Sequence, residues 1–348
     1  MMRTIRKIAN AALILFACFL AFTGCDDDGG LNVPDNELVV KKVIQTDLPA
    51  AGGSGTITVV TDQTLEAIAA DSWLTVSVSG EVVNVSAAEN PNLTGRSTYV
   101  TIKAGTKSTI IAVTQYGISL MKDAGDLKFG TDVADSLIIK FKSNVSAAFK
   151  PSKAWISYSV VGDSVKVHVA ENVTGLPRKG YLRYTLGNIT DSIGVVQASV
   201  NDYIGTWGIY GYDDSGALEA YSATITAGAD GNTLTGDIAG FFSVNYTFDN
   251  GCIVLNAGQK TGTYGSASYP IYLCLGSSSL GSYTWDNTVE FEASPSGVDK
   301  TIVFADNGSW PGRVVDEIYM YVFTASPPSS SNGLGTYLYL QEPFMIKQ

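Results

Sequence analysis

Two glutamates with one residue between them are the closest that this chain comes to a catalytic pair. Glu290 and Glu292 belong to the run Val-Glu-Phe-Glu, and on a strand they would share one face about 7 Å apart. Glycoside hydrolysis needs two carboxylates about 5–10 Å apart across the sugar. The same alternation places Phe291 in the core and leaves both glutamates in solvent, which is the ordinary arrangement on a sheet. We therefore expect no enzymatic activity.

Cysteine and histidine offer little further chemistry. His168 is the only histidine, and its alternation with the flanking valines predicts a position on the solvent face of a strand. Cys252 and Cys274 are the only cysteines expected in the folded part, and neither has a nearby histidine to activate it. An exported protein would allow a disulfide between them, and two buried thiols are the alternative. We expect no metal site and no cofactor.

Composition excludes two classes of protein and points to one end of the chain. Hydrophobic residues make up 45% and charged residues 16% of the sequence, which excludes a disordered polyelectrolyte. The net charge of -11 argues against a nucleic-acid partner, because phosphate binding needs clustered Lys and Arg. Residues 200–348 hold 15 Asp and Glu against four Lys and Arg, together with 13 of the 18 tyrosines.

Aromatic residues of this acidic stretch are the candidates for ligand binding. Tyr and Trp combine an apolar ring with a polar group, which suits a sugar, although both are also common on strands. The candidate ligand-binding residues are Trp285, Trp310, Tyr283 and Tyr319.

The elements that must position these residues are strands, and the middle of the chain is a repeat of them. A gapless offset of 82 residues superimposes residues 71–115 on residues 153–197. The matched pairs are Trp73 with Trp155, Asn90 with Asn172, Arg96 with Arg178, and Gln115 with Gln197. Alternating β-branched segments about ten residues apart predict an immunoglobulin-like sandwich for each copy. We interpret both tryptophans as structural core residues, both arginines as braces to backbone carbonyls, and both asparagines as turn caps.

The first copy resembles a known family. The resemblance lies in Gly52-Gly53, Ser72-Trp73-Leu74 and Thr114-Gln115-Tyr116-Gly117. These landmarks resemble the BACON domain, an immunoglobulin-like module of Bacteroidetes whose name records a proposed link to carbohydrate binding. The resemblance spans residues 37–117. Residues 118–199 lack the Gly-Gly pair and read as a diverged second copy.

The C-terminal stretch, residues 200–348, predicts a third all-β domain. Short strands between Gly, Asp and Asn turns indicate an up-and-down barrel or a sandwich. Its opening, Gly205-Thr206-Trp207, resembles the start of a lipocalin-like barrel. In that family the Trp closes one barrel end beneath an Arg, so the resemblance implies a structural Trp207, with Arg313 as the sole late arginine. The predicted fold class is all-β, with two tandem immunoglobulin-like sandwiches followed by an antiparallel barrel or sandwich.

The N-terminus predicts export. Residues 1–24 join a basic start to an apolar run that is too short for a membrane span. They resemble a bacterial lipoprotein signal, which implies cleavage before Cys25 and lipidation of that residue. Three aspartates follow, and they resemble the acidic export signal of Bacteroidetes surface lipoproteins. Residues 25–36 are predicted to form a flexible acidic tether.

Three functions fit these observations. The leading hypothesis is a lipid-anchored protein of the outer-membrane surface that binds a glycan, from host mucin or diet, without catalysis. The second is a structural role, with the C-terminal domain docking on an outer-membrane or enzyme partner. The third is a lipocalin-like cavity for a small apolar ligand. Exposed aromatic rings favour the first, a contiguous apolar patch the second, and an apolar interior pocket the third.

Overall fold

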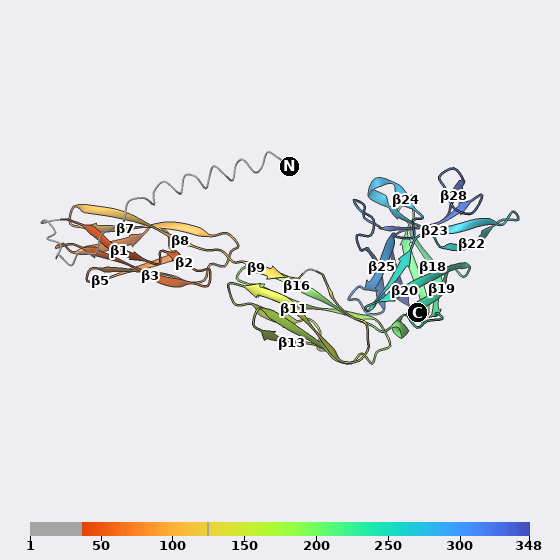
Figure 1. The fold of residues 1–348 in the computed structure, drawn as a ribbon, viewed down its shortest axis with the longest axis horizontal. Coiled ribbons are helices and arrows are strands. Elements are labelled where there is room, and N and C mark those ends of the chain that lie inside the picture. The colour runs from red at the N-terminus through yellow and green to blue at the C-terminus, as the bar shows by residue number, and fades with distance from the viewer. Residues whose placement is uncertain (1–36, 124) are drawn as a thin grey trace. The chain divides into compact units, whose positions relative to one another are not determined.

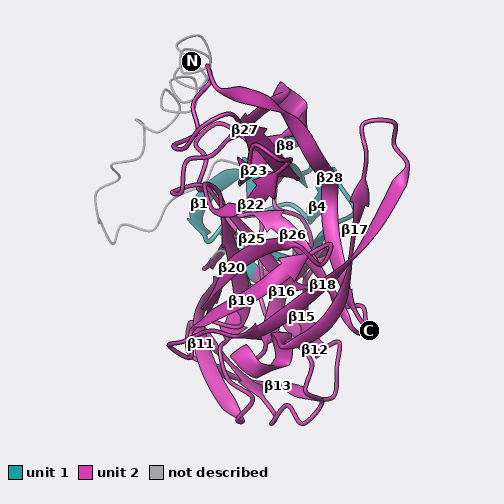
Figure 2. Ribbon diagram, turned by 90° about the vertical axis from the view of Figure 1, so that its right-hand side faces the viewer, with its two compact units in different colours: residues 1–46, 54–86, 98–113 teal, residues 47–53, 87–97, 114–348 magenta. Residues whose placement is uncertain are grey.

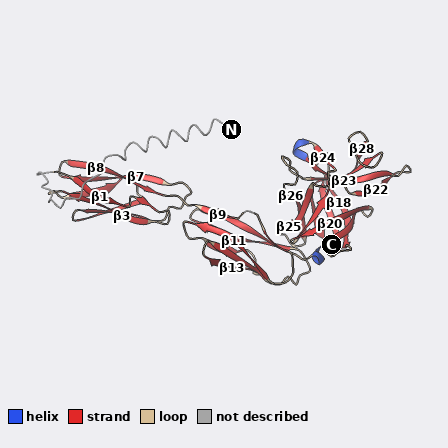
Figure 3. Cartoon of the chain, viewed as in Figure 1, coloured by secondary structure: helices blue, strands red, loops and turns tan. Residues whose placement is uncertain are grey.

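The computed structural model describes residues 37–123 and 125–348. The described chain is built from strands, with two short 3₁₀ helices, η1 (Val200–Tyr203) and η2 (Ser278–Leu280) (Figures 1 and 3). The predicted signal peptide, the lipidation site Cys25 and the tether lie outside the described residues. Within the described ranges, no helix has the length and apolar character needed to cross a membrane. These observations confirm the all-β fold class.

Two compact units divide the chain (Figure 2). One unit contains residues 54–86 and 98–113, and the other contains residues 114–348 with the segments 47–53 and 87–97.

Residues 37–117 form a sandwich of two four-stranded sheets. The first sheet has the order β1 (Val39–Ile44), β3 (Gly53–Val60), β6 (Val82–Ala87), β5 (Leu74–Ser79). The second has the order β2 (Asp47–Leu48), β8 (Lys107–Gln115), β7 (Arg96–Ala104), β4 (Leu65–Ala69). Alternation along β3 buries Ile57 and Val59, as expected for a strand with one face on the core.

Residues 118–199 repeat this topology strand for strand. One sheet has the order β9 (Leu120–Lys122), β11 (Asp135–Ser143), β14 (Ser164–Val169), β13 (Ile156–Val161). The other has the order β10 (Leu127–Phe129), β16 (Ile189–Gln197), β15 (Arg178–Leu186), β12 (Ala148–Pro151). Five of these strands begin 82 residues after their counterparts in the first copy. The repeat read from the sequence is therefore a repeat of structure.

The second copy places His168 on the face of its strand that was predicted for it. Val165, Val167 and Val169 of β14 enter the core, and His168 lies on the opposite face. Its ring nitrogen lies 3.5 Å from the hydroxyl of Ser159 on the neighbouring strand.

The C-terminal domain is an antiparallel barrel with an extra sheet. Eight strands close the barrel: β17 (Gly205–Tyr212), β18 (Leu218–Ala227), β19 (Thr233–Ile238), β20 (Phe242–Asp249), β21 (Cys252–Asn256), β25 (Glu290–Pro295), β26 (Thr301–Asp306) and β28 (Gly333–Lys347). Closure occurs where β28 pairs with β17. The N-terminal half of β28 instead pairs with β27 (Glu317–Phe323), which continues into β23 (Tyr269–Ser277), with β22 (Lys260–Tyr264) and β24 (Ser282–Thr284) beside it.

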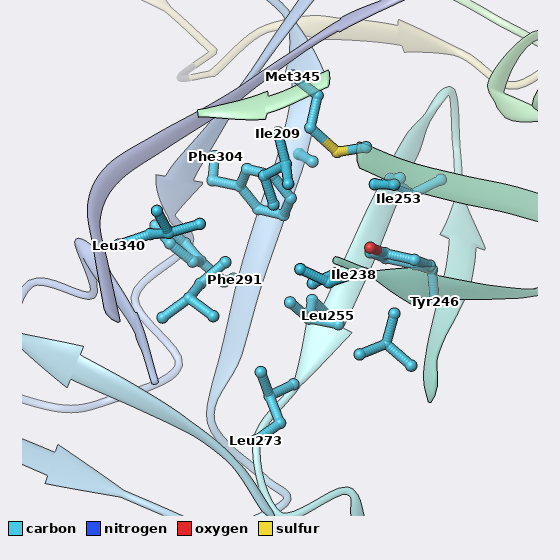
Figure 4. Close-up of a cluster of buried hydrophobic side chains, with 14 of the residues drawn as sticks. Ile209, Ile238, Tyr246, Ile253, Leu255, Leu273, Phe291, Phe304, Leu340 and Met345 are labelled. Carbon is cyan, nitrogen blue, oxygen red and sulfur yellow. The ribbon is translucent and has the colours of Figure 1, made fainter. Parts of the chain in front are cut away.

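Large side chains fill the barrel. Figure 4 shows Ile209, Tyr246, Leu255 and Phe291 meeting in this cluster. Small barrels of this size enclose either packed side chains or one ligand. Because the described interior is packed, the structure argues against the lipocalin-like cavity for an apolar ligand.

Trp207 closes one end of the barrel, but its cation differs from the one that the resemblance implied. The Trp207 ring is fully buried, and its Nε1 donates to the carbonyl oxygen of Tyr203 at 2.8 Å. Lys347, at the end of β28, places its Nζ 4.7 Å from the ring centre and donates to the carbonyl oxygen of Ile204. Arg313 lies instead over Trp310, at 4.8 Å. The expectation of Arg313 above Trp207 is therefore wrong, because the last strand supplies the cation.

Candidate functional site

The outer face of the extra sheet gathers the aromatic residues of the C-terminal domain. Along β27, Ile318, Met320 and Val322 point into the core. Strand alternation therefore sends Tyr319 and Tyr321 to the opposite face. The same alternation on β23 and β28 adds aromatic residues to that face, and β24 contributes one more across it.

Four of these rings follow one another and form what we call the tyrosine track, Trp285, Tyr283, Tyr319 and Tyr339. The ring centres of Trp285 and Tyr283 are 6.2 Å apart, those of Tyr283 and Tyr319 are 5.6 Å apart, and those of Tyr319 and Tyr339 are 4.9 Å apart. Tyr321 stacks on Tyr283 with ring centres 4.9 Å apart and planes 25° apart. All five rings keep part of their surface in solvent.

A second layer of residues supports the track from beneath. Tyr272, Cys274 and Phe323 are buried, and they form a small cluster against which Trp285 and Tyr321 pack. Trp285 meets Phe323 edge-to-face, with ring centres 5.5 Å apart. Edge-to-face pairs of this kind stabilise by about 0.5–1.5 kcal/mol each beyond their area burial. The rings are therefore held in place before any ligand arrives.

Glu317 fixes the hydroxyl groups of two track tyrosines. Its side chain is 3% exposed, and its two carboxylate oxygens accept from the hydroxyls of Tyr319 at 2.9 Å and Tyr339 at 2.6 Å. Gly276 on β23 lies beneath them, because a Cβ there would collide with Glu317 and Tyr319. A charged acceptor makes hydrogen bonds stronger than those between neutral groups.

The tyrosines of the track are neutral at physiological pH. Burial raises the pKa of Tyr319 and Tyr339 well above the ordinary value of 10.0, and the Glu317 carboxylate raises both further. Burial and the hydroxyl of Tyr321 raise the pKa of Tyr283 to about 12. Each of these three tyrosines therefore keeps its hydroxyl proton and presents no charge of its own.

An open depression of about 460 Å³ continues from the track. Tyr319 and Tyr339 form one side of it, and Tyr221 lies on β18 across from them. The other residues that line it are Asp213, Asp214, Glu219, Thr336, Tyr337 and Leu338. Carboxylate oxygens accept hydrogen bonds from hydroxyl groups. The depression therefore pairs ring surfaces with acceptors, without basic side chains among its lining residues.

Three of the four predicted ligand-binding residues come together, and one does not. Tyr283, Trp285 and Tyr319 all belong to the tyrosine track. Trp310 packs against the barrel core with Arg313 on its ring, and it makes no ring contact with the track among the described residues. Sequence reasoning missed Tyr339 and Glu317. Tyr339 alternates with the apolar Leu338 and Leu340, and Glu317 precedes the apolar Ile318. This alternation would have placed both side chains on the face of the sheet that points away from the barrel core.

The other sequence candidates have structural positions. Cys252 and Cys274 are both free and fully buried, so the disulfide alternative is wrong and the alternative of two buried thiols holds. Glu292 is not free in solvent, because Lys128 Nζ lies 2.6 Å from its Oε1. Glu290 accepts from Asn307 Nδ2 at 2.8 Å. The described residues contain no group of three or more His, Cys, Asp or Glu side chains arranged for a metal ion.

The landmarks shared by the two sandwiches also differ in part from expectation. Arg96 and Arg178 donate through Nε to the buried side chains of Gln115 and Gln197, at 2.9 and 3.0 Å. The two glutamines then donate to backbone carbonyls. Arg178 also donates through Nη2 to the carbonyl oxygen of Ala170 at 2.6 Å, as predicted for a brace.

The capping asparagines agree with expectation, and the tryptophans agree in part. Asn90 and Asn172 each donate to the carbonyl four residues later. Both tryptophans are half-buried, and the residues that follow them, Leu74 and Ile156, are the fully buried ones. Trp155 packs against the core of the second sandwich, and the guanidinium carbon of Arg178 lies 4.3 Å from its ring centre.

Comparison with known proteins matches one part of the chain to a family. Residues 63–116 match the family model described as "BACON: Putative binding domain, N-terminal". This match falls within the segment whose sequence resembles that family. No curated protein matches the chain.

Solved structures with similar folds have little sequence in common with this chain. A tandem from titin matches with a TM-score of 0.35 and 9% identity, over 61% of this chain and 98% of that one. A three-Ig fragment of titin matches with a TM-score of 0.26 and 8% identity, over 68% of this chain and 92% of that one. An endo-fucoidan hydrolase of glycoside hydrolase family 107 matches with a TM-score of 0.22 and 9% identity, over 78% of this chain and 42% of that one.

Proposed function

We propose that this chain binds a glycan, without catalysis, at the tyrosine track of its C-terminal barrel. The observation that carries the proposal is the series of partly exposed rings from Trp285 to Tyr339, fixed from beneath by Phe323 and Glu317. Successive rings 4.9–6.2 Å apart offer a continuous platform to a ligand of several sugar units. Fixed rings reduce the ordering cost of binding.

The charge of the site selects among glycans. Asp213, Asp214 and Glu219 line the depression next to the track, and Glu317 lies beneath it. The three carboxylates of the depression accept hydrogen bonds from sugar hydroxyls, and all four repel a carboxylate or a sulfate on the ligand. Neutral segments of mucin or dietary glycans therefore fit this site.

The cellular place of this function is part of the proposal. Lipidation at Cys25 anchors the chain to the outer membrane at the cell surface, and three acyl chains make such an anchoring stable. The two immunoglobulin-like modules of BACON type then serve as a stalk that carries the barrel.

An exposed patch on the barrel favours a second candidate function, docking on a protein partner. Phe241, Tyr264 and Tyr337 are 55%, 50% and 47% exposed, and Tyr337 contacts each of the other two rings edge-to-face. Exposed aromatic patches are typical of protein interfaces. Replacing Phe241 by Ser would abolish docking on an outer-membrane or enzyme partner and leave glycan binding intact.

Screening the full chain on an array of mucin and plant glycans tests the proposed function. We expect binding to neutral oligosaccharides, and we expect Trp285→Ala to abolish it. Tyr99→Ala is the matched control, because Tyr99 is a 60% exposed aromatic residue on β7 of the first sandwich. An array without hits for a folded full chain would contradict the proposal and favour the docking function.

A further inference from the structure

A second depression, of about 320 Å³, lies where the second sandwich meets a hairpin of the barrel. The sandwich contributes Trp155 and Arg178, and the turn between β25 and β26 contributes Val298 and Lys300. It shares no residue with the tyrosine track. The remaining lining residues are Lys153, Thr174, Leu176, Pro177, Lys179, Gly297 and Asp299.

Contacts between the sandwich and the barrel hold the two walls together. Lys128 of β10 forms an ion pair with Glu292 of β25 at 2.6 Å. Within the sandwich, the carbonyl oxygen of Phe129 accepts from the backbone amide of Ala198 at 3.1 Å. Gly251 has φ +84°, and a Cβ at this position would collide with that same carbonyl. The close approach of the β20–β21 turn to the sandwich therefore requires glycine.

Trp155 forms the aromatic part of the depression. Its ring lies against β15 at Gly180, where a Cβ would lie 3.3 Å from the ring. Arg178 covers the ring with its guanidinium carbon 4.3 Å from the ring centre. The Nε and Nη2 of Arg178 bond to Gln197 and to the carbonyl of Ala170, and Nη1 has no hydrogen-bond partner among the described residues. Both N–H groups of Nη1 are therefore left for a ligand.

The charge of this depression is opposite to that of the barrel. Four basic side chains line it, against Asp299. Lys179 is compensated, because its Nζ lies 2.7 Å from Asp126. Lys153 and Lys300 have no carboxylate within ion-pair distance in the described part of the chain. In a chain of net charge -11, two uncompensated lysines and a fixed arginine form a local site for an anion.

We infer that this depression is a second binding site, for an acidic saccharide. The part of the Trp155 ring left exposed beside Arg178 contacts the sugar, and Lys153, Lys300 and the Nη1 group of Arg178 bind its carboxylate or sulfate group. Nη1 donates charge-assisted hydrogen bonds to either anion, and the two lysines add charge from opposite walls. This site stands independently of the tyrosine track, whose carboxylates disfavour the same ligands.

Calorimetric titration of the full chain tests the inference with two matched pairs of probes. Tetragalacturonate and its methyl ester test a carboxylate, and 3′-sulfated lactose and lactose test a sulfate. We expect at least one acidic probe to bind at least tenfold more tightly than its neutral counterpart, with an affinity that falls as salt rises. The pair that shows the difference identifies the anion.

Charge reversal then locates the site. Lys153→Glu and Lys300→Glu are each expected to weaken binding of the acidic probe at least tenfold, because each places a carboxylate where the anion binds. Lys107→Glu makes the same charge change on an exposed position of β8 and is expected to leave the affinity unchanged. Absence of binding to both acidic probes, equal affinity for acidic and neutral probes, or equal loss in all three variants would overturn the inference.

Discussion

Tyr319 and Tyr339 lie side by side on neighbouring strands, with ring centres 4.9 Å apart, and both hydroxyls donate to one buried carboxylate. That carboxylate, Glu317, has no Lys or Arg within ion-pair distance in the described chain. A buried carboxylate without hydrogen bonds would be costly, so the two tyrosines stabilise Glu317 as much as it orients them.

Replacing Glu317 by Gln is expected to loosen this arrangement. The amide nitrogen of Gln cannot accept a hydrogen bond, so one of the two tyrosine hydroxyls loses its acceptor, and we expect a loss of about 1–3 kcal/mol in the free energy of unfolding. We also expect the pKa of both tyrosines to fall, because the Glu317 charge that raises it is removed, so that their ultraviolet titration moves to lower pH. Glu219→Gln, which affects the bond from Tyr221 at 3.1 Å, is the control. An unchanged titration would contradict this role of Glu317.

Asp202 is expected to make stability depend on pH. Burial, together with the neighbouring Asp132 carboxyl, raises its pKa from the ordinary 3.8 to about 6, although the hydrogen bond from the Ser199 amide opposes this. Arg178 and Lys347 are the cations close enough to interact with it. A raised pKa in the folded state means that the stabilisation is full below pH 4 and is lost as pH rises through 6.

Comparison with Asp202→Asn isolates this effect. Between pH 4 and pH 8, the free energy of unfolding of the unmodified chain should fall by about 2 kcal/mol relative to that of the variant. Each pKa unit corresponds to about 1.4 kcal/mol. Urea unfolding of both proteins at the two pH values measures the difference. A constant difference across this range would show that Asp202 is ionised throughout.

The two barrel cysteines are expected to be unreactive in the folded chain. Burial raises the pKa of the Cys252 thiol and of the Cys274 thiol to about 12 each, and thiolate is the reactive form. Iodoacetamide should therefore modify neither residue until urea unfolds the protein, and both should then react without a reductant. Mass spectrometry of the peptides measures this. A peptide pair linked through Cys252 and Cys274 would contradict the free thiols.

The ion pair between Lys128 and Glu292 is expected to stabilise the junction of the second sandwich with the barrel. Their side chains are 30% and 19% exposed. Lys128→Ala should therefore cost about 1–3 kcal/mol, because Glu292 is left without its partner in a partly buried place. Lys142→Ala is the matched control, since its pair with Asp163 at 2.7 Å is 57% and 61% exposed and such pairs contribute about 0–1 kcal/mol. Equal costs would show that the junction does not depend on this pair.

Local patterns in the sequence predicted the strands and the repeat, because alternation and turn residues act over a few positions. Val165, Val167 and Val169 indicated a buried face that the structure confirms. The interactions that bring distant strands together were not predictable in this way. Lys347 over Trp207 and Glu292 beside Lys128 join residues more than a hundred positions apart, and no local signal marks either pair.

The candidate site was predictable only by residue type. Tyr283, Trp285, Tyr319 and Trp310 were all selected as aromatic residues of the acidic stretch, and the fold brings the first three together while it turns Trp310 toward the core. Trp155 was interpreted as a core residue, and it packs against the core while part of its ring stays exposed under Arg178.

Titration of the full chain with a neutral oligosaccharide selected on the array is the most direct test of the tyrosine track. We expect Tyr283→Ala and Tyr319→Ala each to weaken binding about 3- to 10-fold, which corresponds to about 0.6–1.4 kcal/mol for the loss of one ring. Tyr99→Ala should leave the affinity unchanged while all three variants remain folded by circular dichroism. Equal affinity of the two track variants and the unmodified chain would contradict glycan binding at this site.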